Sequence, residues 1–363
     1  MSLILYMYEM LSQVANDETS PSVMMSLPDD LIMDIIARVS RFNYAALSLV
    51  CKKFRFLISL TDELYKRRSL LGSTEYCVYV RVLETQNNVV RMYILNQKNK
   101  RNMPCLAPIL SLPHMPLSAS YDVVGSNIFV MGGFYDHING PPSSTALCID
   151  CRTHVARHVA NMPITFSGIV RSKVIDEKIN VFGRSVDEPS MTWESEIVMV
   201  FDTRTETWEH GTKPDSEVDP RWFKSFSTVT DEHHINAQEN KWETDEILHY
   251  NLYCDECVMD DVLYRHERDT NILKTYDLKQ RIWGVVKGLE KFPLISSNSN
   301  MVSCGKKLIL FLQKDDFAPI REIWCVEITV ERREGGEIWG KIECCDLLLD
   351  GCFYLFNCLA VLV

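Results

Sequence analysis

The chain has 363 residues, of which 46% are hydrophobic and 24% are charged, a composition typical of a soluble globular protein. The formal net charge of −11 argues against a nucleic-acid partner, because binding a phosphate backbone needs clustered Lys and Arg. The thirteen cysteines are scattered along the chain, unlike the dense cysteine frameworks of small extracellular domains. We therefore expect reduced thiols and a cytoplasmic and/or nuclear location.

Residues 1–25 are interpreted as a disordered tail, because the second half of this segment is polar and contains proline. The first ten residues carry no Lys or Arg, whereas a secretory signal begins with a basic region. At the other end, the apolar run 352–363 is shorter than the roughly 20 residues that span a bilayer. The sequence therefore predicts no membrane partner, and we assign this run to strands.

Residues 26–72 show the apolar periodicity of three or four short helices. Pro28 stands near the first helical position, and Asp29 and Asp30 follow it, where the helix dipole favours acids. Apolar residues then recur at helical spacing, at Leu31, Ile32, Ile35, Ile36 and Val39. A module of about 45 residues barely supports its own core. We therefore expect it to need a partner surface, and to share little core with the domain that follows.

A repeated hairpin pattern fills much of the remaining chain. Three times a Trp lies six residues after an Asp or Asn, and a fourth copy has Ala at the Trp position. A Gly pair follows the strand predicted at 128–131, where glycine supplies the positive φ of a sharp exit, and the next unit keeps one Gly of this pair. The repeat residues are Gly132, Gly133, Asp150, Gly183, Asp202, Trp208, Asn236, Trp242, Asp277, Trp283 and Trp339. Self-similarity at a period of about 50 residues is typical of kelch-type propeller blades.

Strands are left over at both ends of the repeat region, at 76–95 in front and at 352–363 behind. Because open sheet edges invite aggregation, we predict that these strands share one blade and close the ring. That arrangement gives six blades. The blade at 225–250 lacks a middle strand and is interpreted as degenerate; the count is five if this segment forms no blade.

Two cysteine pairs suggest a metal site but do not support one. Cys148 and Cys151 share the two-residue spacing of Cys254 and Cys257, which suits zinc ligands in a tight turn. Both pairs fall in or beside predicted strands, where positions i and i+3 face opposite sides of a sheet.

The sequence also lacks a nucleophile elbow, a P-loop and a dinucleotide fingerprint. We expect no metal, no cofactor and no catalytic residues. Trp193 and Trp222 lie outside the repeat, in predicted loops. Each is interpreted either as a contact for a protein partner or as a side chain that covers the edge of the core.

The chain resembles the plant-type F-box/kelch-repeat proteins. The F-box resemblance lies in Ser26-Leu27-Pro28-Asp29-Asp30-Leu31, in Ile35, and in the run Leu47-Ser48-Leu49-Val50-Cys51-Lys52-Lys53-Phe54. It continues through residues 63–75 into the blade region. It implies a mainly β protein, with a small helical F-box at 26–72 followed by a kelch-type β-propeller at 73–363.

The resemblance also implies a function. The F-box would dock onto a Skp-type adaptor, and through it onto cullin and RING subunits, while the propeller would bind a target protein for ubiquitination in an SCF-type ubiquitin ligase. The residues implied in docking are Leu27, Pro28, Leu31, Ile35, Leu47, Val50, Cys51 and Phe54. Some of these must instead form the core of the module. The sequence names neither the target nor the propeller face that binds it.

Two alternatives remain open at this stage. The first is an F-box/kelch scaffold that binds the adaptor without promoting ubiquitination, which a degenerate blade would favour. The second is an enzyme similar to the copper oxidases built on kelch propellers, which would need Tyr, Cys and His ligands converging on the axis. The sequence offers no such set, and fold alone does not decide function.

Overall fold

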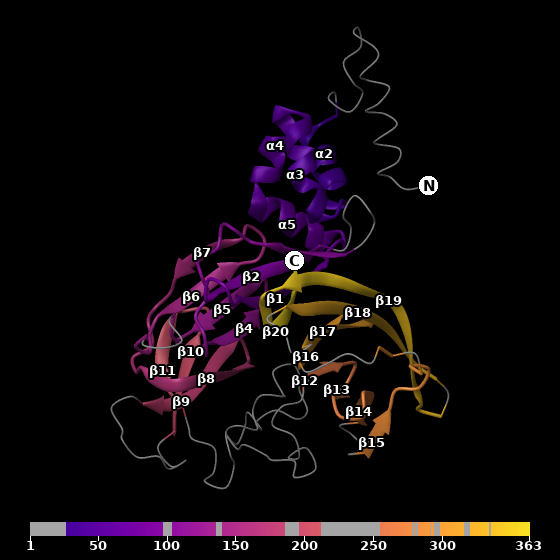
Figure 1. Ribbon diagram of the computed structural model, residues 1–363. Coiled ribbons are helices and arrows are strands. Elements are labelled where there is room, and N and C mark those ends of the chain that lie inside the picture. The colour runs from indigo at the N-terminus through magenta and orange to yellow at the C-terminus, as the bar shows by residue number, and fades with distance from the viewer. Residues whose placement is uncertain are drawn as a thin grey trace. The chain divides into compact units, whose positions relative to one another are not determined.

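The computed structural model (Figure 1) describes residues 27–363 apart from 97–103, 136–139, 186–195, 212–254, 278–279, 281, 291, 294–297, 316–319 and 334. The chain divides into two compact units. One unit runs to Glu75 and also contains Leu362–Val363, and the other comprises Tyr76–Val361.

The first unit is helical. A 3-10 turn follows the first helix, and the elements are α2 (Asp29–Ala37), η2 (Arg41–Asn43), α3 (Tyr44–Val50), α4 (Lys52–Ser59) and α5 (Thr61–Leu70). Pro28 occupies the N-cap position of α2 with φ −57°, and Asp29 and Asp30 occupy the first turn of the helix, as predicted. The Cys51 Sγ accepts a hydrogen bond from the Phe54 N–H at 3.4 Å, which caps α4.

The buried face of α2 is shifted by one residue from the stripe that begins at Leu31. Ile32, Met33 and Ile36 are 0–2% exposed, whereas Leu31 is 50% exposed. Residues 31–33 and 35–37 of this helix are all apolar, so helical periodicity alone does not select the face that packs inward. Phe54, Leu57 and Leu64 from α4 and α5 complete the small core.

The second unit consists of antiparallel four-stranded sheets, the blades of a β-propeller (Figure 1). The closing blade contains β20 (Phe353–Leu362), β1 (Tyr76–Glu84), β2 (Val89–Asn96) and β3 (Cys105–Pro108). The second blade contains β4 (Ser120–Val124), β5 (Asn127–Met131), β6 (Ala146–Asp150) and β7 (Val155–His158), and the third blade contains β8 (Phe166–Ile175), β9 (Lys178–Ser185), β10 (Glu196–Asp202) and β11 (Thr207–His210). The fourth blade contains β12 (Asp255–Met259), β13 (Val262–Glu267), β14 (Ile272–Asp277) and β15 (Ile282–Val285), and the fifth blade contains β16 (Asn298–Cys304), β17 (Lys307–Asp315), β18 (Arg321–Arg332) and β19 (Ile338–Gly351).

The predicted sharing of one blade by the front and back strands is confirmed. The strand order of the closing blade is β20-β1-β2-β3, so the strand from the end of the sequence lies beside the first. Both the N–H and the Oγ1 of Thr85 donate to the Cys352 carbonyl, at 2.9 and 3.0 Å. The edge of β1 is therefore paired rather than open.

The predicted count of six blades is wrong for the residues that the structure describes, which form five sheets. The closing blade takes strands from both ends of the chain, and the strands from β4 to β19 form four more blades. The degenerate blade predicted at 225–250, with Asn236 and Trp242, lies outside the described residues.

The core of the propeller lies between neighbouring blades. Val78, Val80 and Val82 of the closing blade share one hydrophobic cluster with Ile309 and Phe311 of the fifth blade. Similar clusters join the second blade to the third and the fourth to the fifth. These blades thus bury apolar faces against a neighbouring blade, as blades of a propeller do.

The Asp of the repeat organises the turn that follows it. Asp202 Oδ1 accepts hydrogen bonds from the N–H groups of Arg204 and Thr205, at 2.9 and 3.2 Å. The turn then passes through Glu206 at φ +55°, and the Glu206 N–H donates to the Asp202 carbonyl at 2.9 Å. Asp150 and Asp277 accept from turn N–H groups in the same way.

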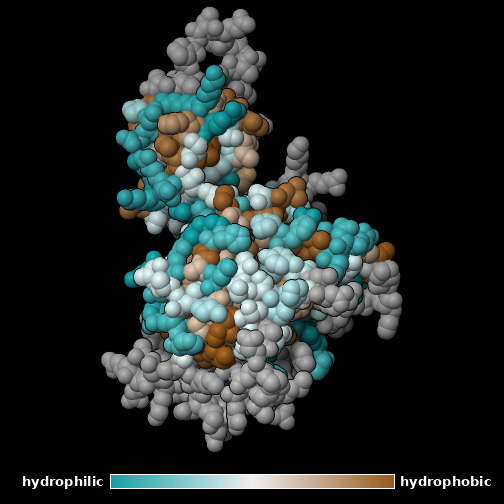
Figure 2. Space-filling model, turned by 90° about the vertical axis from the view of Figure 1, so that its left-hand side faces the viewer, coloured by the Kyte–Doolittle hydropathy of each residue, from teal (hydrophilic) through white to brown (hydrophobic). Residues whose placement is uncertain are grey.

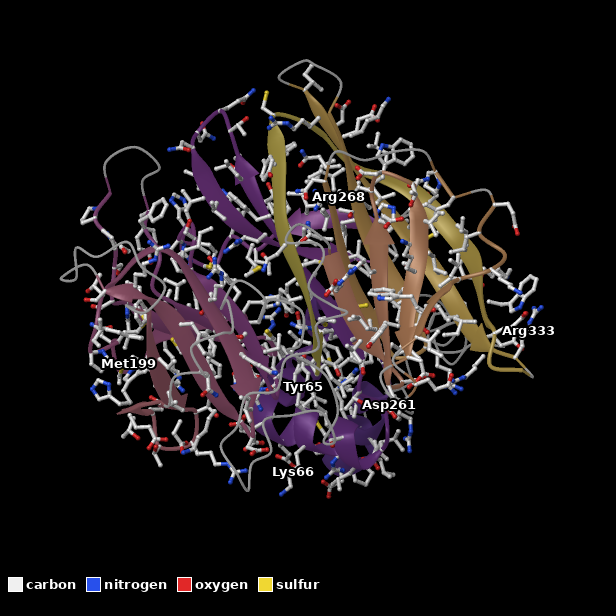
Figure 3. All side chains as sticks on the ribbon, turned by 90° about the horizontal axis from the view of Figure 1, so that it is seen from below. Tyr65, Lys66, Met199, Asp261, Arg268 and Arg333 are labelled. Carbon is white, nitrogen blue, oxygen red and sulfur yellow. The ribbon has the colours of Figure 1, made fainter. Side chains whose placement is uncertain are left out.

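The Trp of the repeat pairs with the residue just before the Asp. Trp208 lies directly across from Phe201, with ring centroids 4.9 Å apart, and its Nε1–H donates to the Ala160 carbonyl beyond the preceding blade's last strand at 2.7 Å. Trp283 stacks on Tyr276 at 5.0 Å. Trp339 differs, because it lies opposite Glu331 and the Arg333 guanidinium covers its ring at 4.2 Å. Figure 3 labels Arg333 at the edge of this sheet.

The glycines of the repeat have two different roles. Gly132 and Gly133 follow β5 with the predicted positive φ, +68° and +84°. A Cβ on Gly133 would lie 2.3 Å from the Leu117 carbonyl oxygen. Gly183 instead lies inside β9, paired with Ile197, and leaves space for the ring of Phe166. The one glycine that the third blade keeps from the repeated pair therefore serves packing rather than a strand exit.

Candidate docking surface and its support

The helical unit carries large apolar side chains on its exterior. Leu49 is 77% exposed, Phe56 57%, Leu31 50% and Val50 43%. Figure 2 shows brown apolar areas between the teal polar side chains of this unit. Large apolar groups left in water on a unit this small mark a surface that another protein can cover.

The residues predicted to dock fall into three groups. Pro28, Leu31 and Val50 are exposed. Phe54 is 2% exposed, so it belongs to the core of the unit and cannot contact a partner. The remaining four residues are half-buried: Leu27, Ile35, Leu47 and Cys51.

Sequence reasoning missed the two most exposed apolar residues of α3 and α4, Leu49 and Phe56. Helical spacing could have found them. Tyr44 is the buried residue of α3, and Leu49 lies five positions later, away from the three- and four-residue steps that share a helix face. Phe56 is likewise offset from the buried Phe54 and Leu57 of α4.

Ion pairs fasten the start of α2 to the later helices. Lys53 on α4 lies 2.8 Å from Asp29 and donates to the Leu27 carbonyl at 3.0 Å. Arg67 on α5 pairs with Asp30 at 3.2 Å and Asp34 at 3.0 Å, and the hydrogen bond that Arg67 donates to Asp34 raises the pKa of Arg67. These pairs are partly exposed to solvent, so each contributes modestly to stability.

A buried arginine joins the helices from inside. Arg68 on α5 is 1% exposed. Its Nη1 donates to the carbonyls of Ala37 and Val39 at 3.2 and 2.6 Å and to the Tyr44 hydroxyl at 2.8 Å. Ala37 is the last residue of α2 and Val39 lies two residues beyond it, at the helix end where the dipole favours a cation. Burial raises the pKa of Tyr44. Arg68 therefore fixes α5, the end of α2 and the start of α3 against one another.

The carboxylate of Glu75 completes this network. Its Oε1 lies 3.0 Å from Arg68 Nη2 and accepts the Arg41 N–H at 2.6 Å. Among the described residues, Glu75 is the acid that pairs with Arg68. Figure 3 labels Tyr65 on α5, whose ring centroid lies 5.7 Å from the Arg68 guanidinium. No sequence pattern marked Arg68, because its partners are main-chain groups far away in sequence.

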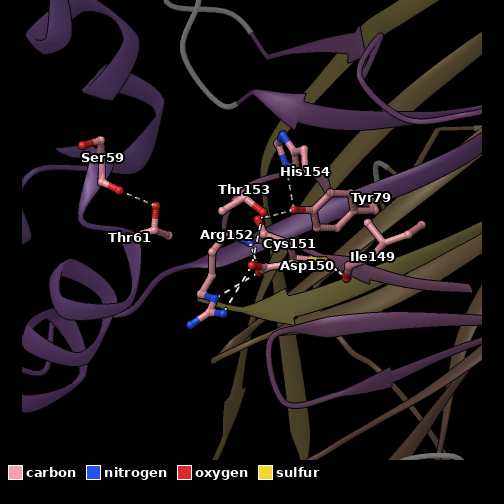
Figure 4. Close-up of polar contacts among 9 residues, drawn as sticks. All are labelled: Ser59, Thr61, Tyr79, Ile149, Asp150, Cys151, Arg152, Thr153 and His154. Carbon is pink, nitrogen blue, oxygen red and sulfur yellow. Dashed lines mark hydrogen bonds and ion pairs between the residues drawn. The ribbon is translucent and has the colours of Figure 1, made fainter. Parts of the chain in front are cut away.

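In the propeller, a polar contact links the closing blade to the second blade (Figure 4). The Tyr79 hydroxyl on β1 donates to the Cys151 carbonyl at 3.0 Å and lies 3.0 Å from His154 Nε2. Arg152 and Asp150 pair within the same turn at 3.0 Å. Tyr79 is fully buried, so this contact is part of how the ring is held together.

The described members of the two cysteine pairs considered as zinc ligands lie in different blades. Cys148 and Cys151 lie at the end of β6 in the second blade, and Cys257 lies on β12 in the fourth. Within the described residues, no three His, Cys, Asp or Glu side chains lie together as metal ligands would. Cys254, Trp193 and Trp222 lie outside the described residues. No described helix is long and apolar enough to cross a membrane.

Comparison with known proteins agrees with both units. The F-box domain matches residues 24–64, and the FKB95 kelch-repeats domain matches residues 85–349. An F-box/kelch-repeat protein of Arabidopsis thaliana is 52% identical, over 97% of this chain and 100% of that relative. A second from the same plant is 41% identical, over 94% of this chain and 95% of the relative. The chain therefore belongs to the F-box/kelch-repeat protein family.

Proposed function

We propose that this chain is the substrate-recognition subunit of an SCF-type ubiquitin ligase. Its helical unit docks onto a Skp-type adaptor, which connects it to cullin and RING subunits, and its propeller binds the protein to be ubiquitinated. An F-box joined to a kelch propeller implies a substrate-recognition adaptor, and members of this family are in general non-catalytic. The chain acts by raising the effective concentration of a bound target near the ubiquitin-loaded enzyme.

The observation that carries this proposal is the apolar exterior of a small helical unit whose interior is already filled. Leu49, Phe56 and Leu31 are at least half exposed, while Ile32, Ile36 and Phe54 form the core beneath. Burying such side chains stabilises a complex by about 25 cal/mol per Å² of apolar surface, before the entropy of association is subtracted. A protein partner is therefore the ligand that this surface fits.

We also propose a cytoplasmic and/or nuclear location. No disulfide joins any of the twelve cysteines in the described part of the chain, which fits a reducing compartment.

The test is assembly of the complex from purified proteins. The full chain is mixed with a Skp-type adaptor alone, and then with the adaptor plus cullin and RING subunits, and each mixture is analysed by sedimentation velocity. The expected result is a 1:1 complex with the adaptor and one larger species that contains all four proteins. A chain that binds the adaptor but stays out of the cullin complex would instead be the scaffold that does not promote ubiquitination. No complex with the adaptor would overturn the proposal.

A further inference from the structure

Glu75 and Val363 form a reciprocal main-chain pair. The Glu75 N–H donates to the Val363 carbonyl at 2.8 Å, and the Val363 N–H donates to the Glu75 carbonyl at 3.0 Å. Such an exchange of both hydrogen bonds is the pairing of an antiparallel ladder. Glu75 directly precedes β1 and Val363 directly follows β20, so the pair continues the strand pairing that closes the ring. Val363 is 5% exposed, and water cannot easily replace these bonds.

The same pair belongs to the helical unit. Leu362 and Val363 group with the helices rather than with the propeller. Two residues more than 280 positions beyond α5 are part of the module, because the partner of Val363 is Glu75, which also holds Arg68.

Two hydrogen bonds hold the side chain of Glu75 in place. One oxygen accepts both the Arg41 N–H and the Arg68 guanidinium, at 2.6 and 3.0 Å. Arg68 is nearly inaccessible to water, and losing its carboxylate leaves a buried charge without a counter-charge. A change in the main-chain position of Glu75 therefore reaches the Arg68 contacts with Ala37, Val39 and Tyr44.

We propose that Glu75 and Val363 are positioning residues for docking. Val363 fixes the main chain of Glu75, Glu75 fixes Arg68, and Arg68 fixes the end of α2 against α3 and α5. The module then reaches its docking arrangement only when β20 has closed the ring. A chain whose propeller is incomplete docks poorly, so that docking onto the adaptor depends on a fully folded target-binding domain. The docking half of this inference rests on the proposed function; the coupling of the helices to Val363 does not.

The coupling is tested by hydrogen–deuterium exchange of the full-length chain. The variants are Glu75→Ala, deletion of residues 362–363, and both together. We expect each single variant to speed exchange at least tenfold in the amides of residues 38–44 and of α5, with the blade β8–β11 unchanged. Because both changes act on one chain of contacts, the double variant should exceed the larger single effect only slightly.

Thr85→Val is the matched control. It removes the side-chain hydrogen bond to Cys352 at the other end of the β1–β20 pairing but touches nothing in the helical unit. Its helical amides should exchange as in the unmodified chain. Helical amides that keep their original rates in both Glu75→Ala and the deletion would overturn the inference, and so would equal acceleration in Thr85→Val.

Docking is measured in a separate experiment, as the Kd of each variant for a Skp-type adaptor. Glu75→Ala and the deletion should weaken binding about tenfold or more, and Thr85→Val should not. If the unmodified chain binds no adaptor, the proposed function fails, while the exchange rates still decide the coupling. If exchange accelerates as expected but the Kd is unchanged in both variants, the positioning role is overturned.

Discussion

Ser172 on β8 donates a hydrogen bond to the carboxylate of Asp122 on β4, so the first strands of two neighbouring blades are joined at a buried acid. Asp122 is 5% exposed. Burial raises its pKa to about 6, although the hydrogen bond from Ser172 acts in the opposite direction. The propeller therefore holds a titratable group whose charge is costly in the folded state.

This acid predicts a specific pH dependence. The folded pKa of about 6 lies above the ordinary value of 3.8, so between these values the native state binds the proton that the unfolded state has lost. The contribution of Asp122 to stability therefore falls as pH rises from about 4 through 6 and stays lost above. The Asp122→Asn substitution removes the cost of the buried charge. The variant should therefore be more stable than the unmodified chain at pH 7.5, by up to about 3 kcal/mol.

The measurement is urea unfolding of both proteins between pH 5 and 8. The difference in the free energy of unfolding should grow with pH and then level off above the folded pKa. Ser172→Ala should move the rise to higher pH, because it removes a bond that favours the carboxylate. A difference that is constant over this range would contradict the assignment.

Trp283→Ala should destabilise the fourth blade by about 2–3 kcal/mol, because the indole stacks on Tyr276 and lies 4.5 Å from the Arg265 guanidinium. Arg265 in turn pairs with the buried Glu256. Trp283→Phe keeps a ring over both neighbours and should lose about half as much. Ile282→Ala, one position away and 60% exposed, is the control and should be nearly neutral. Circular dichroism during urea unfolding compares the three, and equal losses at both positions would refute the pairing.

Gly133→Ala should be far more damaging than Gly125→Ala, although both glycines have positive φ. At Gly125 a Cβ would meet nothing within 4 Å, so the cost is the left-handed backbone alone, about 1–2 kcal/mol. At Gly133 the Cβ would lie 2.3 Å from the Leu117 carbonyl oxygen and 2.7 Å from the Ala119 nitrogen, and main-chain atoms cannot rotate away. Melting temperatures of the two variants decide this, and similar values would contradict it.

The sequence was informative where local chemistry decides structure. Pro28 and the acids after it predicted the start of α2, and the Asp-to-Trp spacing predicted hairpins whose register places Trp208 opposite Phe201. The need to cover a sheet edge predicted the pairing of the front and back strands. Each of these features depends on neighbours in sequence or on a general rule about edges.

The sequence was silent where distant main-chain groups decide. An arginine at position 68 reads as an exposed helix end, yet its partners are carbonyls of Ala37 and Val39 and the carboxylate of Glu75. The buried face of α2 was also ambiguous, because Leu31 and Ile32 are both apolar and tertiary contacts choose between them. The predicted count of six blades included segment 225–250, which lies outside the described residues, and those residues form five.

The central claim is that the apolar exterior of the helical unit docks onto a Skp-type adaptor. The most direct measurement is the Kd for that adaptor, by titration calorimetry, of the full chain and of two matched variants. Leu49→Glu changes a leucine of α3 that is 77% exposed, and Leu110→Glu changes an equally exposed leucine of the propeller unit. Both should leave the melting temperature unchanged, because neither side chain is packed. We expect Leu49→Glu to weaken binding at least a hundredfold, which is about 2.7 kcal/mol, and Leu110→Glu to leave it unchanged. Equal affinities for Leu49→Glu and the unmodified chain would contradict the claim.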